Sequence, residues 1–167
     1  MKKSLIAAAV ALAATFASAA PTSTPLTFDN DTLYLGNTPG AGAFFDEYTF
    51  EVPYALSNIS GSLNTTLLGN QDVDFTKIYL TNGSTVVYNF TQLLADSPTN
   101  GTEVWGLSNA SLASGITYHL FVEGVSTVGR TAYSGVMTVS AVPEPGTWAL
   151  ALAGLGAIAF VARRRQA

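Results

Sequence analysis

The chain has 167 residues, few charged side chains and no cysteine. Between its Ala-rich ends lie two basic and ten acidic residues, a formal charge of −8, so we expect no nucleic-acid partner. The absence of cysteine excludes disulfide scaffolds, thiolate catalysis and cysteine metal sites. Such an acidic surface suits an exported protein or one that collects cations.

The amino terminus predicts a secretory signal peptide. Two lysines precede an apolar run over residues 5–14, and small residues follow it. Ala17 and Ala19 fit the A-x-A cleavage pattern, so residues 1–19 form the predicted signal peptide and signal peptidase is a predicted partner. An uncleaved anchor is the weaker alternative, because the apolar run is too short to span a bilayer comfortably.

The middle of the chain predicts short strands. Residues 21–25, rich in Pro, Ser and Thr, predict a linker, and β-prone runs separated by Gly, Asn, Asp and Pro follow. Asn82-Gly83 is a strong hairpin signal, whereas residues 91–96 predict at most a turn of helix. The predicted strands are residues 32–35, 44–52, 59–68, 75–81, 85–90, 103–107, 117–123 and 132–139.

About eight short strands without a long helical period predict an all-β domain over residues 20–141. We expect an antiparallel β-sandwich that is jelly-roll-like, with a closed barrel as the alternative.

The remaining segment, residues 142–167, predicts a membrane-held tail with one transmembrane helix. A polar motif comes first, an apolar run over residues 148–162 follows, and a basic cluster completes it. The run spans about 22 Å as a helix, short of a ~30 Å hydrocarbon core. The arginines are expected on the cytoplasmic side, with the extended proline motif at the outer interface. The motif and cluster residues are Val142, Pro143, Glu144, Pro145, Arg163, Arg164 and Arg165.

Two segments resemble a known family. The tail from Val142 to Arg165 resembles a PEP-CTERM sorting signal. Phe44, Asp46 and Tyr48 resemble the signature of the FxDxF family of PEP-CTERM proteins, with Tyr48 departing at the final aromatic position. Residues 72–83 and 133–135 are also similar to parts of that family.

The resemblance implies a non-enzymatic protein exported by a Gram-negative bacterium that makes exopolysaccharide. It also implies a partner, exosortase, a membrane-embedded cysteine transpeptidase that cuts at the PEP motif. The protein would pass from the inner membrane to the cell surface or extracellular matrix and associate there with exopolysaccharide. The residues alone leave open an uncleaved tail-anchored envelope protein.

Few residues of the domain predict chemistry. His119 is the single histidine and no G-x-S-x-G motif accompanies it, so a structural or solvent-facing histidine is favoured over a hydrolase. Asp72 and Asp74 share a strand face and, near Asn70 and Gln71, form a candidate Ca²⁺ site. A solvated loop is the favoured interpretation there, and we expect no cofactor.

The Phe44, Asp46 and Tyr48 signature is expected to be structural. Aromatic residues allow two interpretations, a sugar-binding row or, preferably, core packing; they are Tyr34, Tyr54, Tyr79, Tyr88, Tyr118 and Trp105. Seven N-x-S/T sequons are interpreted as Asn, Ser and Thr enrichment on β-surfaces and turns, with glycosylation left open. The leading hypothesis is a structural or adhesive matrix protein, and the alternative is a carbohydrate- or Ca²⁺-binding adhesion module.

Overall fold

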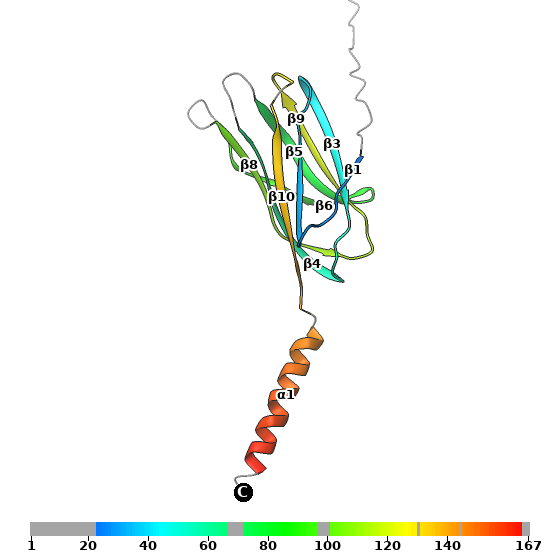
Figure 1. Cartoon of the computed structure of the whole chain (residues 1–167), viewed down its shortest axis with the longest axis vertical. Helices are drawn as coiled ribbons and strands as arrows, with labels where there is room; N and C mark the ends of the chain where they lie inside the picture. The colour runs from blue at the N-terminus through cyan, green and yellow to red at the C-terminus, as the bar shows by residue number, and fades with distance from the viewer. Residues whose placement is uncertain (1–22, 67–71, 97–100, 130, 144, 165–167) are drawn as a thin grey trace, which may run out of the picture.

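The structure is a computed structural model that describes residues 23–66, 72–96, 101–129, 131–143 and 145–164. In this part of the chain two five-stranded sheets face each other, and one helix lies apart from them (Figure 1). Sheet A has the order β1 (Ser23–Pro25), β3 (Gly42–Phe50), β9 (Tyr118–Ser126), β5 (Val73–Asn82) and β6 (Thr85–Asn89). Sheet B has the order β2 (Thr32–Asn37), β10 (Tyr133–Ala141), β4 (Leu56–Thr66), β8 (Thr102–Ala113) and β7 (Thr91–Leu94).

The chain alternates between the two sheets. From β2 to β5 each strand lies in the opposite sheet to the one before, and β8, β9 and β10 alternate again. Between these runs the chain crosses from β6 to β7 at the buried Phe90, whose N–H donates to the carbonyl of Ile78 at 2.9 Å. This strand order is that of a jelly roll, and all pairs except β1–β3 are antiparallel. The predicted all-β class is confirmed.

One hydrophobic core lies between the sheets. Alternate residues of each strand point inward, as the twofold period of a half-buried strand requires. Ile78, Leu120 and Val122 of sheet A are fully buried against partners such as Leu33 and Met137 of sheet B. The predicted Asn82-Gly83 hairpin joins β5 to β6, with Gly83 at a φ of 74° that favours glycine.

Two local predictions were wrong. Residues 91–94 form β7, which pairs with β8, and make no turn of helix. The predicted linker includes β1, which pairs in parallel with β3; the next N–H, that of Leu26, donates to the carbonyl of Thr49 at 2.7 Å. Both strands are short and lie at sheet edges, so a neighbouring strand stabilises them more than their own sequence does. The predicted signal peptide, residues 1–19, lies outside the described residues.

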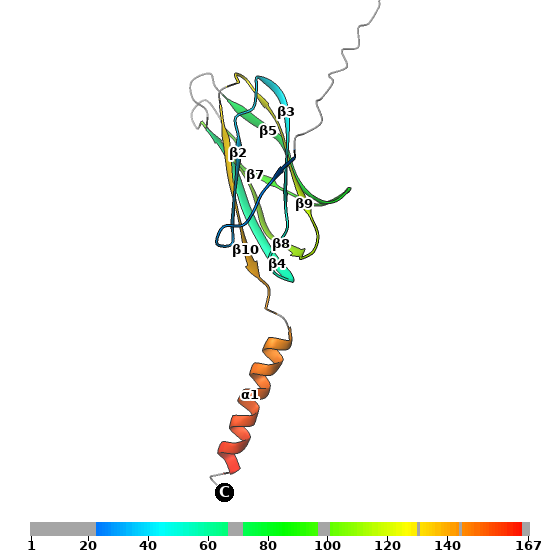
Figure 2. The ribbon, with the colours of Figure 1, turned by 45° about the vertical axis from the view of Figure 1, so that its right-hand side comes forward.

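The carboxyl-terminal helix is longer than the apolar run that predicted it. Helix α1 (Pro145–Arg164) has 20 residues and begins at a proline, a residue favoured at the first helical position. It is therefore about 30 Å long, matching a hydrocarbon core, and the predicted shortfall is corrected. Residues 146–164 have a mean hydropathy of 1.5 and bury nothing against the protein; the helix stands clear of both sheets in two views (Figures 1 and 2).

Candidate functional sites

The residues of the FxDxF-like signature converge on one side chain of the opposite sheet. The Tyr133 hydroxyl of β10 donates to Asp46 Oδ2 at 2.5 Å and lies 2.8 Å from the Tyr48 hydroxyl. The ring of Phe44 stacks on that of Tyr133 at 5.7 Å between centroids, and Asn37 Nδ2 donates to both Asp46 oxygens at 3.0 Å. We call this set the Tyr133 clamp. Its polar atoms bind one another across the core, which fits the structural role predicted for the signature.

Burial shapes the electrostatics of the clamp. Desolvation, followed by the hydrogen bond to Asp46, raises the pKa of Tyr133 far above its ordinary value. Desolvation also raises the pKa of Tyr48. Both tyrosines therefore stay neutral at physiological pH, where they act as hydrogen-bonding groups and not as bases.

A second buried carboxylate was missed by the sequence analysis. Glu103 of β8 is 2% exposed and accepts hydrogen bonds from the Phe75 N–H at 2.9 Å, Gln92 Nε2 at 2.6 Å and Trp105 Nε1 at 2.7 Å. These donors come from both sheets, so Glu103 is a further link across the core. The sequence offered one signal: an isolated acid in an otherwise uncharged strand.

The candidate Ca²⁺ residues gain a third carboxylate in the structure. Asp96, which follows β7, joins Asp72 and Asp74, with one carboxylate oxygen of each within 4.8 Å of the others. Asp72 Oδ1 is buried and has no hydrogen-bond partner among the described residues. Asn70 and Gln71, predicted to lie near this site, fall outside the described residues.

Burial and mutual repulsion both act on the carboxylates of this cluster. Burial, and then the charges of Asp74 and Asp96, raise the pKa of Asp72. Burial, and then the charges of Asp96 and Glu103, raise the pKa of Asp74. Three carboxylate ligands of this kind suit a hard cation such as Ca²⁺, which would relieve the repulsion.

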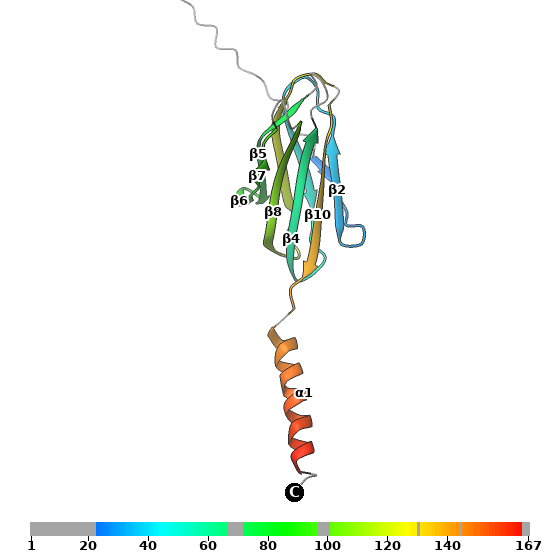
Figure 3. The same ribbon diagram turned by 90° about the vertical axis from the view of Figure 1, so that its left-hand side faces the viewer.

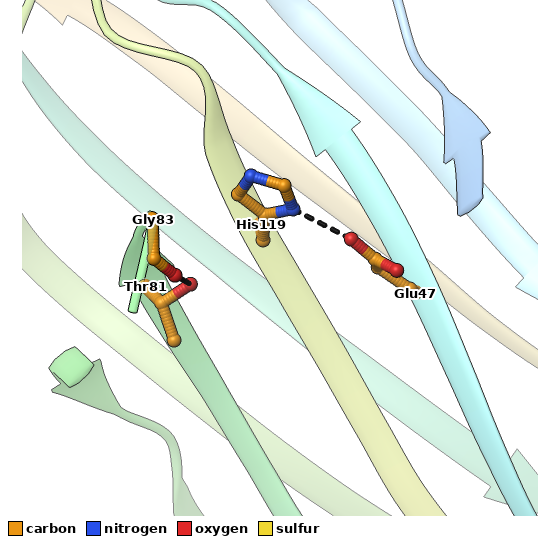
Figure 4. A network of polar contacts seen from close by, with 4 residues as sticks. All are labelled: Glu47, Thr81, Gly83 and His119. Carbon is orange, nitrogen blue, oxygen red and sulfur yellow. Dashed lines mark hydrogen bonds and ion pairs between the residues drawn. The ribbon is translucent and has the colours of Figure 1, made fainter. Parts of the chain in front are cut away.

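His119 lies on the outer face of sheet A, where its Nδ1 is 2.5 Å from Glu47 Oε1 of the neighbouring strand (Figure 4). Thr81 lies opposite His119 in the pairing of β5 with β9, and its hydroxyl donates to the carbonyl of Gly83 at 3.0 Å. A depression of about 470 Å³ at the edge of the sheet is lined by Pro25, Leu26, Thr27, Phe28, Thr49, Phe50, Glu51, Pro53 and Thr117, without His119. His119 therefore has a carboxylate partner but does not line this depression, and the expectation of a non-enzymatic protein stays a prediction.

The aromatic residues considered for a sugar-binding row are dispersed. Tyr118 is buried, and Tyr54, Tyr88 and Trp105 pack against the core. Outside the core, the ring of Phe121 stacks on Phe45 at 5.3 Å and on Tyr79 at 5.1 Å, across three strands of sheet A. Because these rings cover one another, they do not present a flat platform of free ring faces.

The outer face of sheet B is uncharged. Strands β8, β4, β10 and β2 lie side by side on this face (Figure 3), and the one charged residue of the sheet, Glu103, points inward. Exposed Ser, Thr and Asn side chains lie on this face together with Tyr34, which is 68% exposed and is paired with the exposed Val136. The N-x-S/T pattern has a structural cause here, since Asn64 and Thr66 are two apart on β4 and share the outer face. We call this surface the hydroxyl-amide face.

Comparison with known proteins found a match for the carboxyl-terminal tail. A family model for the PEP-CTERM protein-sorting motif matches residues 141–165, a segment that includes α1 and the residues predicted for sorting. A search of curated proteins found no match for the chain. The matched segment lies outside the two sheets except for Ala141, and the FxDxF assignment stays a prediction.

Proposed function

We propose that the protein is exported and sorted by exosortase, and that its sorted form is a non-enzymatic component of the cell surface or extracellular matrix. The PEP-CTERM sorting motif at residues 141–165 supports this proposal. The observation that carries the proposal is the arrangement of the tail. The motif directly follows the last strand, and α1 beyond it is apolar, unburied and long enough to span a bilayer.

The tail can hold the protein at the membrane until it is processed. Arg163 and Arg164, in the last turn of α1, favour the cytoplasmic side, which leaves Pro143 outside. A cysteine thiolate of exosortase would attack a peptide carbonyl in the motif and expel the tail as a free amine. The resulting thioester would then pass its acyl group to water or to an acceptor amine.

Intact-mass analysis of the protein outside the cell tests this sequence of events. We expect a mature form that starts at Ala20 and ends near Pro143. Replacing Glu144 by Ala, or deleting residues 163–165, should leave unprocessed protein in the inner membrane. Glu144 and Arg165 lie outside the described residues, so this prediction rests on the motif. Normal release of both variants would refute sorting, and wild-type protein that keeps its tail would favour a tail-anchored envelope protein.

The hydroxyl-amide face supports association with exopolysaccharide. Uncharged hydroxyl and amide groups exchange hydrogen bonds with the hydroxyls of a neutral glycan, and the exposed Tyr34 adds a rigid apolar surface. Each hydrogen bond contributes little in water, so binding would depend on many contacts along the polymer.

Affinity electrophoresis of the full chain in gels containing dextran, galactomannan or alginate measures this association. Retardation by a neutral polymer is expected, and Thr138→Glu, which places a charge on the face, should reduce it about tenfold or more. Thr76→Glu adds the same charge to an exposed position of sheet A and is the matched control. If the wild-type protein migrates equally in gels with and without each polymer, association through this face is refuted.

A second candidate function is Ca²⁺ binding. The observation that favours it is the convergence of Asp96 on the predicted pair Asp72 and Asp74, together with the unpartnered Asp72 Oδ1. Calcium titration with thermal melting tests it: the midpoint should rise at millimolar Ca²⁺ and stay constant in an Asp72→Asn, Asp74→Asn variant. An unchanged wild-type midpoint would refute the site.

A further inference from the structure

The sorting motif follows the last core strand with no linker. Strand β10 pairs with β4 up to Ala141, opposite Ser57, and the N–H of Val142 still donates to the carbonyl of Leu56 at 3.0 Å. Helix α1 begins at Pro145. At full extension the chain from Ala141 to Pro145 covers about 14 Å, so the folded domain sits close to the membrane surface when α1 spans it.

The end of β10 is held on one side only. Pairing with β2 stops at Thr138, whereas pairing with β4 continues to Ala141. Apart from the ladder to β4, one further backbone hydrogen bond of 2.9 Å joins Val139 N–H to the carbonyl of Asp31. The last residues of β10 can therefore separate from β4 locally, without disrupting the core between the sheets.

Peptidases commonly bind substrates as extended strands through backbone hydrogen bonds. For a cut within the motif, the residues on the domain side are Val142 and the end of β10, whose edge facing β4 is already paired, as the bond from the Val142 N–H to the carbonyl of Leu56 shows. We propose that the end of β10, Ser140 to Val142, is a latch that must detach from β4 before exosortase can process the chain. This inference rests on the proposed sorting function. It adds that the folded domain limits the rate at which exosortase removes the tail.

Two engineered disulfides on the same strand pair test the latch. Ser140 lies opposite Asn58 at the latch, and Ser134 lies opposite Asn64 near the other end of the ladder. The substitutions Ser140→Cys and Asn58→Cys lock the latch, and Ser134→Cys with Asn64→Cys is a control with the same residue types and the same pairing geometry. Opposed residues of an antiparallel pair are within disulfide reach, and the chain has no other cysteine.

Pulse–chase labelling of cells that make the full chain gives the half-time of tail removal. We expect the oxidised latch variant to be processed at least about tenfold more slowly than wild type, the control at the wild-type rate, and the latch variant to recover when a reductant is added. Inserting Gly-Ser-Gly-Ser between Ala141 and Val142 of the oxidised latch variant should also restore processing, because the motif then reaches the enzyme without opening β10.

Wild-type processing of the oxidised latch variant, or no rescue by the inserted linker, would overturn the latch. Failure of sorting itself has a different outcome, since Glu144→Ala would then behave like wild type while neither disulfide had any effect.

Discussion

At the scale of single residues, the Tyr133 clamp shows how a short signature can serve the fold. Phe44, Asp46 and Tyr48 occupy one face of β3, as alternate residues of a strand do. The sequence did not predict their common partner, because Tyr133 is more than eighty residues away and reaches them only when the sheets face each other. The charge of Asp46 is tolerated because Tyr133 and Asn37 donate hydrogen bonds to it.

Replacing Tyr133 by Phe should destabilise the domain by about 1–3 kcal/mol, because Asp46 loses a donor and the buried Tyr48 hydroxyl loses its partner. Urea unfolding measures the change as a lower midpoint with an unchanged slope. Tyr34→Phe removes a hydroxyl from an exposed ring and should leave the midpoint unchanged. Equal midpoints for the two variants would contradict the clamp.

The acidic cluster has a predictable pH dependence. The folded state raises the pKa of Asp72 and Asp74, so it binds protons more tightly than the unfolded chain does. The burial and repulsion of these carboxylates therefore destabilise the fold above the raised pKa values, and this cost is relieved as the pH falls through them towards the ordinary value of about 3.9. In calcium-free buffer at pH 7, Asp74→Asn should raise stability by up to about 1 kcal/mol, a figure that allows for solvent screening.

Thermal melting of wild type and Asp74→Asn across pH 4 to 7 checks this sign. The melting midpoint of the variant should exceed that of wild type by less as the pH is lowered, because protonation already neutralises the wild-type carboxylates. A constant difference, or a less stable variant at pH 7 without calcium, would show that the charge of Asp74 does not destabilise the fold.

At the scale of elements, the clearest sequence patterns gave the right strands. The strand predicted over residues 44–52 corresponds to β3, and the predicted Asn-Gly turn joins β5 to β6; both rest on local signals, and both predictions are confirmed. Strands β1 and β7 were missed because they contain three and four residues and form by pairing at sheet edges. Strand β8 extends from Thr102 to Ala113, well beyond its predicted end at residue 107, because it pairs along the whole of β4.

Helix α1 depends on a membrane for its apolar surface, since Leu150, Leu155 and Ile158 are each at least 65% exposed. Replacing Leu155, near the middle of the helix, by Asp should add about 3 kcal/mol to the cost of insertion. We expect the unprocessed variant to be extracted from membranes by alkaline carbonate. Thr147→Asp places the same charge near the outer end of the helix, where it should be tolerated; equal extraction of both variants would argue against a spanning orientation.

At the scale of the whole molecule, the domain and its tail are energetically separate. All residues of the hydrophobic core lie between Leu33 and Val139, and the window over residues 146–164 buries nothing against the protein. A chain that stops after Pro143 should therefore have the same free energy of unfolding as the full chain in the same detergent, within about 0.5 kcal/mol. Urea unfolding measures it, and the two midpoints should agree. A lower midpoint for the shortened chain would show that the tail supports the fold.

The sequence by itself determined the all-β class, the sorting motif and the apolar tail, because each is carried by neighbouring residues: a twofold period, a four-residue motif and a continuous hydrophobic run. Only the tertiary structure decided the jelly-roll order, the convergence of Asp96 on Asp72 and Asp74, and the use of Tyr133 and Glu103 as links across the core. These features join residues that are far apart in the chain, and the packing of two sheets around one core fixes which of them meet.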